Sequence, residues 1–160
     1  MKPNFLYCVL LLGALASCKQ SGGGMDAQID PRDQYVGSYQ GGYSGQVTTG
    51  SFVSSIFSGS ALITVEKAAA PKEVTLTVVY NKGQAFENSE KLTAELTARK
   101  FVIIDKRIEK VASGPTTYEL PYTATGEFTE RSQFVMTTSS EIERGGTTLK
   151  KVAGITGEKK

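Results

Sequence analysis

Apolar and polar side chains alternate along much of this chain, which predicts β-strands. The clearest case is the segment 34–46. Its odd positions are alternately tyrosine and glycine: Tyr35, Gly37, Tyr39, Gly41, Tyr43 and Gly45. Successive side chains of a strand point to opposite faces, so these residues share one face. Small barrels alternate large and small inward residues, which favours a core strand; an aromatic ligand-binding wall is the alternative.

The segment 48–60 allows two predictions. Phe52, Val53, Ile56 and Phe57 have the spacing of one face of a helical turn. A short helix or apolar loop here would cover one end of a barrel. Serine, threonine and valine between and around these residues are compatible with strands, so a long first hairpin is the alternative.

Further alternating segments predict the remaining strands. They are 61–67, 73–81, 92–98, 101–104, 118–124, 128–136 and 147–156. Turn sequences, such as Gly145-Gly146, separate several of them. The charged run 105–110 is interpreted as a solvated strand end. About eight short strands without a long helical period predict an all-β protein, an antiparallel up-and-down barrel.

The first eighteen residues have the layout of a secretory signal. Lys2 precedes the apolar segment 5–16, which is shorter than the about 20 residues that span a bilayer. It ends in Leu15-Ala16-Ser17-Cys18, which resembles the bacterial lipobox. The resemblance implies cleavage before Cys18 and attachment of lipid to its sulfur. The expected organisation is a signal peptide (1–17), a lipidated cysteine with a flexible tether (18–33) and a β-barrel domain (34–160).

Composition removes several functional classes. The chain has 18 Lys plus Arg against 16 Asp plus Glu, scattered along its length, which gives no support for nucleic-acid binding. It has no histidine, which removes Ser-His and Cys-His catalysis. With Cys18 lipidated, the usual zinc ligands are also missing. Phosphate-loop and nucleophile-elbow motifs are absent. We expect no enzyme activity, no cofactor and no metal.

A second resemblance concerns the barrel itself. Gly37-Ser38-Tyr39 resembles the Gly-x-Trp opening of lipocalins, with tyrosine in the tryptophan position. The length and strand rhythm of 34–160 are similar to those of small bacterial lipocalin-like lipoproteins. The resemblance implies a calycin-type barrel, with a cavity for a lipid or other small apolar ligand. The arginine that packs on the tryptophan in lipocalins would be Arg131 or Arg144.

The expected function is that of a membrane-anchored, lipocalin-like lipoprotein of the cell envelope. The residue after Cys18 is Lys19 and not aspartate. In this the chain resembles lipoproteins that two-membrane bacteria pass to the outer membrane. The alternative is a structural or interaction lipoprotein with a filled core, which touches envelope proteins or glycans by its surface. The candidate ligand-lining residues are Tyr35, Tyr39, Tyr43, Phe52, Ile56 and Phe57.

Overall fold

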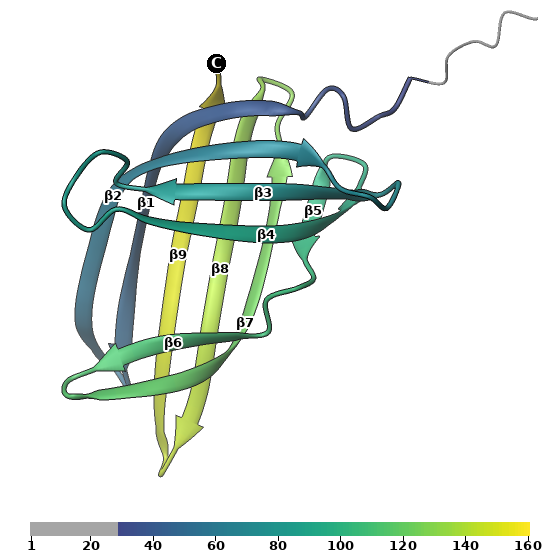
Figure 1. Ribbon diagram of the computed structural model, residues 1–160. Coiled ribbons are helices and arrows are strands. Elements are labelled where there is room, and N and C mark those ends of the chain that lie inside the picture. Colours follow the sequence, from purple (N-terminus) through teal and green to yellow (C-terminus); the bar gives the residue numbers. More distant parts are fainter. Residues whose placement is uncertain (1–28) are drawn as a thin grey trace, which may run out of the picture.

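The computed structural model describes residues 29–160, which form nine antiparallel strands (Figure 1). The strands are β1 (Gly37–Thr49), β2 (Phe52–Lys67), β3 (Glu73–Tyr80), β4 (Asn88–Thr97), β5 (Lys100–Ile103), β6 (Ile108–Ser113), β7 (Thr116–Phe128), β8 (Gln133–Arg144) and β9 (Thr147–Lys159). Within this range no helix is long and apolar enough to cross a membrane. The predicted signal peptide and Cys18 lie outside the described residues.

Eight of the strands close into a barrel. Neighbours pair in the order β5-β4-β3-β2-β1-β9-β8-β7, and pairing of β5 with β7 completes the ring. The ninth strand, β6, pairs with the first part of β7 and lies outside this ring. The prediction of an all-β antiparallel barrel of about eight strands is therefore confirmed.

The β1–β2 hairpin decides between the two predictions for 48–60. β2 is one strand of 16 residues, paired with β1 along its length and interrupted by one register shift beside Val47. The helix or loop over a barrel end is therefore wrong, and the long first hairpin is observed. Phe52 and Ile56 are each 78% exposed, so they do not cover the barrel. As a strand, this segment forms backbone hydrogen bonds with β1 at alternate residues. A single isolated helical turn would leave most of its backbone N–H groups without a partner.

One end of the barrel is packed with aromatic rings. Tyr35 stacks on Phe128 with 4.5 Å between ring centroids, and Phe101 stacks on Phe134 at 5.4 Å. Tyr39 lies beside Phe128 and Phe134 and is almost fully buried. The odd-numbered tyrosines of β1 thus point inward, and Tyr35 and Tyr39 belong to the larger apolar core.

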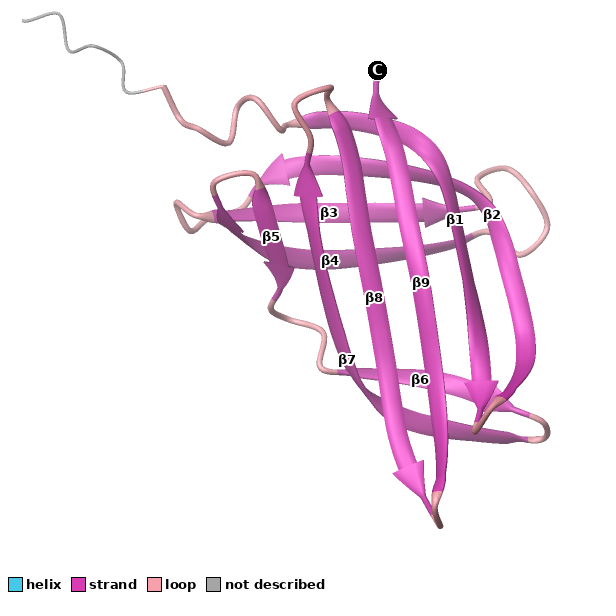
Figure 2. Ribbon diagram, turned by 180° about the vertical axis from the view of Figure 1, so that it is seen from behind, coloured by secondary structure: helices cyan, strands magenta, loops and turns pink. Residues whose placement is uncertain are grey.

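A second, smaller apolar cluster lies in the opposite part of the molecule. It consists of Val47, Val111, Leu120 and Leu149, with Phe57, Tyr118 and Ile142 packed against it. The long strands β1, β2, β7, β8 and β9 reach it, whereas β3 pairs only with the 61–67 part of β2. Figures 1 and 2 show β3, β4 and β5 near one end and β6 towards the other. The barrel wall is therefore incomplete between the β3–β4 turn and β6.

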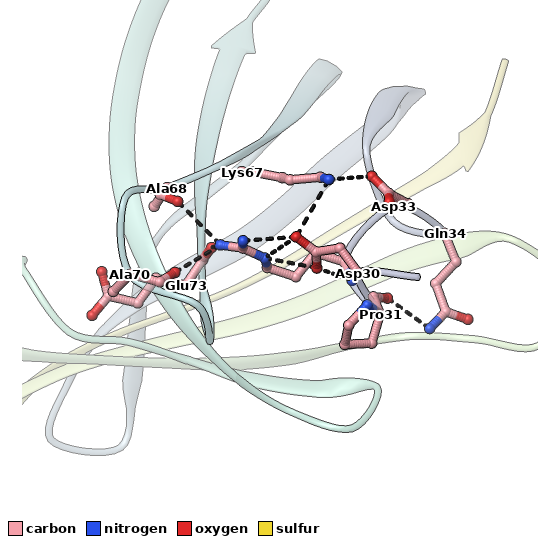
Figure 3. Close-up of polar contacts among 9 residues, drawn as sticks. Asp30, Pro31, Asp33, Gln34, Lys67, Ala68, Ala70 and Glu73 are labelled. Atoms are coloured by element: carbon pink, nitrogen blue, oxygen red, sulfur yellow. Dashed lines mark hydrogen bonds and ion pairs between the residues drawn. The ribbon is translucent and has the colours of Figure 1, made fainter. Parts of the chain in front are cut away.

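Residues 30–33, predicted to be part of the tether, are held against the barrel (Figure 3). The Arg32 guanidinium donates hydrogen bonds to the carbonyls of Ala68, Ala70 and Glu73 in the β2–β3 turn, at 3.0, 2.7 and 3.0 Å. Asp30 pairs with Arg32 at 2.8 Å and with Lys67 at 3.3 Å. Residues 30–33 are thus bonded to the barrel, because a planar guanidinium satisfies several turn carbonyls at once.

Tyr39, the residue in the lipocalin tryptophan position, has a lysine as its neighbouring cation. Lys159 Nζ lies 5.9 Å from the Tyr39 ring centroid and donates to the Gln34 carbonyl at 2.8 Å. Arg144 lies over the Tyr118 ring. In the described part of the chain, neither arginine expected from the resemblance is recorded over Tyr39. Burial, reinforced by Tyr35, raises the pKa of Tyr39 to about 12, and its hydroxyl donates to the Tyr35 carbonyl at 2.8 Å.

We predict that Gly41→Ala destabilises the barrel and that Gly154→Ala does not. A Cβ at Gly41 would overlap the Thr156 carbonyl oxygen and lie 2.7 Å from the Gly157 Cα, whereas a Cβ at Gly154 meets open space. Overpacking costs about 1–3 kcal/mol, so urea unfolding should report a loss of that size for Gly41→Ala. Gly154→Ala should be neutral or slightly stabilising. Equal stabilities of the two variants would contradict the close approach of β1 and β9.

Candidate ligand-binding cavity

A cavity of about 420 Å³ lies where the barrel wall is incomplete, and we call it the side cavity. Its lining includes side chains of the larger core, such as Tyr122 and Ile155, and Phe57 of the smaller cluster. The cavity therefore borders both apolar clusters, which meet at the Tyr43 and Phe57 rings, with 6.2 Å between ring centroids. It is partly open to solvent, and its volume is in the range that small-molecule sites occupy.

Tyrosines form one wall of the side cavity. Tyr43 and Tyr80 meet edge to face, with 5.0 Å between ring centroids. The Asn81 side-chain amide donates to the Tyr43 hydroxyl at 3.0 Å, and Asn81 has a positive φ of 52° that ends β3 in a turn. Burial, and then the charge of Glu90, raises the pKa of both Tyr80 and Tyr122. Both hydroxyls are therefore protonated at neutral pH.

Four charged side chains line the side cavity as alternating ion pairs. Lys106 Nζ lies 2.5 Å from Glu90 Oε1 and 3.9 Å from Glu109 Oε1. Lys151 Nζ lies 2.6 Å from the same Glu109 oxygen, and these four side chains are only 14–26% exposed. We call this set, Glu90, Lys106, Glu109 and Lys151, the ion-pair chain. It has two positive and two negative charges.

Glu109 is the central residue of the ion-pair chain. Burial raises the pKa of Glu109. Hydrogen bonds from Lys151 and Ser140, together with the charges of Lys151 and Lys106, lower the pKa by more than burial raises it. The net effect holds the pKa of Glu109 below its usual range, so the carboxylate is ionised at neutral pH. The Ser140 hydroxyl donates to Glu109 Oε2 at 2.7 Å, so each carboxylate oxygen has a partner.

The charged run 105–110, interpreted from the sequence as a solvated strand end, in fact supplies Lys106 and Glu109 to the side cavity. Four residues of the run, Asp105, Arg107, Ile108 and Lys110, are exposed as expected, whereas Lys106 and Glu109 are half-buried in the cavity lining. One pattern could have indicated this: Glu109 and the buried Val111 are two apart, so they share a face of β6.

The candidate ligand-lining residues fall in three places. Tyr43 and Phe57 line the side cavity. Tyr35 and Tyr39 lie in the larger core, among packed rings. Phe52 and Ile56 are exposed on the β1–β2 hairpin and are not part of the cavity lining. The lining residues that sequence reasoning missed include Asn81 and Phe86 of the β3–β4 turn and the ion-pair chain.

An exposed aromatic residue stands at the edge of the side cavity. Phe86, in the turn between β3 and β4, lines the cavity and is 92% exposed. Its φ of 68° lies in the left-handed region, which is uncommon for an aromatic residue. Such conformations are more frequent at ligand-binding positions than elsewhere.

Comparison with known proteins adds no assignment: no protein-family model matches the chain, and no curated protein matches it in sequence. The fold and the cavity therefore define the class. The described chain is an antiparallel eight-stranded barrel with one outer strand, consistent with a lipocalin-like fold, and it has a mixed aromatic and charged cavity at its side.

We predict that Glu109→Gln lowers the free energy of unfolding by about 2 kcal/mol. The variant leaves Lys151 without its carboxylate partner in a partly buried site. Loss of an exposed ion pair costs about 0–1 kcal/mol and loss of one partner of a buried pair about 3–5 kcal/mol, so we expect an intermediate loss of stability. The matched control is Glu141→Gln, which removes the partner of Lys150 in an exposed pair at 2.7 Å. Urea unfolding measures both. Equal effects would contradict a structural role of the ion-pair chain.

Proposed function

We propose that this protein is a lipid-anchored, lipocalin-like binding protein of the cell envelope, which holds a small ligand in the side cavity. The observation that carries the binding part is the cavity beside two apolar clusters. Partly buried charges cost desolvation energy. A purely structural barrel does not require four of them beside a partly open hollow, so the ion-pair chain in the cavity lining supports a binding role.

The anchor part of the proposal rests on Leu15-Ala16-Ser17-Cys18. Lipidation at Cys18 would hold the protein at a membrane, since two or more acyl chains bind firmly where one binds only marginally. Lys19, in place of aspartate, supports the outer membrane as the destination. In this proposal the partner of the N-terminus is the bilayer, and nucleic acid has no role.

We propose binding and not catalysis as the role of the cavity. Glu109 is bound by Lys151 and Ser140, and Glu90 is bound by Lys106. The Glu109 carboxylate is therefore held ionised, and both carboxylates are fixed in ion pairs, which suits a fixed binding surface better than an exchange of protons with a substrate.

One observation favours a second candidate function, an interaction lipoprotein. Phe52, Val53 and Ile56 are each exposed on the β1–β2 hairpin, Val53 and Ile56 on one face and Phe52 on the other, and exposed apolar side chains of this kind suit contact with an envelope protein. In that case variants of the side cavity would leave function unchanged, whereas serine at Phe52 and Ile56 would abolish it.

The anchor is tested by Cys18→Ser. We expect this variant to lose labelling by radioactive palmitate and either to leave the membrane fraction or to accumulate as the unprocessed precursor. Cys8→Ser, which changes the other cysteine within the predicted signal peptide, is the matched control and should be labelled normally. Normal palmitate labelling of Cys18→Ser would rule out this anchor.

The binding role is tested by filling the cavity. Ala153 lines it and is nearly buried, so Ala153→Leu should occupy ligand space, whereas Thr137→Leu adds the same side chain at an exposed position of β8. We expect mass spectrometry of solvent extracts to detect a compound that co-purifies with the wild type and with Thr137→Leu and is depleted at least about tenfold from Ala153→Leu. Identical extracts from all three would contradict the binding role.

A further inference from the structure

We propose that the side cavity binds a neutral, polyhydroxylated ligand, a monosaccharide or disaccharide, and not a fatty acid or a charged small molecule. This inference rests on the proposed function, because it names the chemical class of the ligand in the same cavity. It departs from the apolar ligand that the lipocalin resemblance implies.

The charge of the lining is the first reason. The ion-pair chain has equal numbers of ammonium and carboxylate groups, and each is already within ion-pair distance of an opposite charge. A fatty-acid carboxylate would compete with Glu90 and Glu109 for the two lysines and leave a partly buried carboxylate unpaired. A cationic ligand would do the same to the lysines. A neutral ligand avoids this cost, which is largest where groups are withdrawn from water.

The hydrogen-bonding groups of the lining are the second reason. Glu90 and Glu109 offer acceptors, Lys106 and Lys151 offer donors, and all four lie along one path across the cavity. The Tyr43 hydroxyl accepts a hydrogen bond from Asn81, which leaves its own proton free to donate. A ligand hydroxyl donates and accepts at once, so it can bind next to a Lys–Glu pair and keep that pair intact. An alkyl chain could not use the hydrogen-bonding capacity that remains on these groups after they have paired with one another.

The aromatic residues are the third reason. Lys106 Nζ lies 4.1 Å from the Tyr122 ring centroid, and Lys151 Nζ lies 5.3 Å from that of Phe57, so ammonium groups already cover these rings. Phe86, in contrast, is 92% exposed at the cavity edge. The negative face of an aromatic ring attracts partly positive C–H groups, and one side of a sugar ring presents several of these. Phe86 is thus placed to stack on a sugar whose hydroxyls reach the ion-pair chain.

The shape of the cavity agrees with this class. Its opening to solvent suits a water-soluble ligand that enters with part of its surface exposed. Its volume of about 420 Å³ is in the lower part of the range for small-molecule sites, which is adequate for one or two sugar rings. A fatty acid with a long alkyl chain requires a deep apolar channel. The interior of this barrel is instead filled at its packed end by Tyr39, Phe128 and Phe134.

The proposal is tested by saturation-transfer NMR on the full chain, extracted in a detergent without a sugar headgroup. The neutral probes are glucose, cellobiose, maltose and N,N′-diacetylchitobiose. The charged probes are glucosamine and glucuronate, which keep the pyranose ring, and the fatty-acid probe is cis-parinaric acid. We expect at least one neutral saccharide to bind more tightly than glucosamine, glucuronate and cis-parinaric acid. Phe86→Ala should weaken this binding about tenfold, as for loss of one well-packed aromatic contact.

Phe52→Ala is the matched control, since Phe52 is an exposed phenylalanine away from the cavity, and it should bind saccharide like the wild type. Tighter binding of cis-parinaric acid or of a charged sugar would overturn the ligand class. Absence of saccharide binding would overturn it as well. In both cases the proposed function survives if the wild-type extract still differs from that of Ala153→Leu. Saccharide binding that is unchanged in Phe86→Ala and in Ala153→Leu would place the sugar elsewhere and overturn the site.

Discussion

Closure of the barrel by the short pairing of β5 with β7 is the constraint on which the rest of the structure depends. Only three residue pairs make it, Lys100–Val102 against Thr125–Glu127. Gly126 lies at its centre, where a Cβ would overlap the Phe101 ring and the Val135 carbonyl. This close approach brings Phe101 onto Phe128 and Phe134, so the closed end is also the packed end. Beyond it β7 continues with β6 as its partner, and there the wall stays open.

The side cavity lies at this opening in the wall, and the side chains around the opening determine its chemistry. Three segments supply its charged side chains: the start of β4, the link into β6 together with the start of β6, and β9. Each contributes one or two charged side chains, so the ion-pair chain is assembled across strands that are not neighbours. Such pairs stabilise a fold less than apolar packing of the same volume would. Their presence beside two apolar clusters is the feature on which the proposed binding role rests.

The cation beside Tyr39 is not one of the two arginines that the lipocalin resemblance implies. It is Lys159, at the end of β9. Lys159 also binds the Gln34 carbonyl, so one side chain joins the last strand to the segment before β1. Arg32 adds a second connection, to the β2–β3 turn. Together they hold the residues that precede the barrel against its packed end, which is where the chain enters from the predicted tether.

The sequence by itself determined most of the strands and the inward face of β1, because side-chain alternation is a local property of an extended chain. It left 48–60 open, since four apolar residues fit either a helical turn or a strand, and only pairing with β1 decided the matter. It also missed most of the cavity. Lys151 and Glu109 are 42 residues apart and meet only because the β-strands close into a barrel. No local pattern encodes such a contact, so the tertiary structure alone brought these charges together.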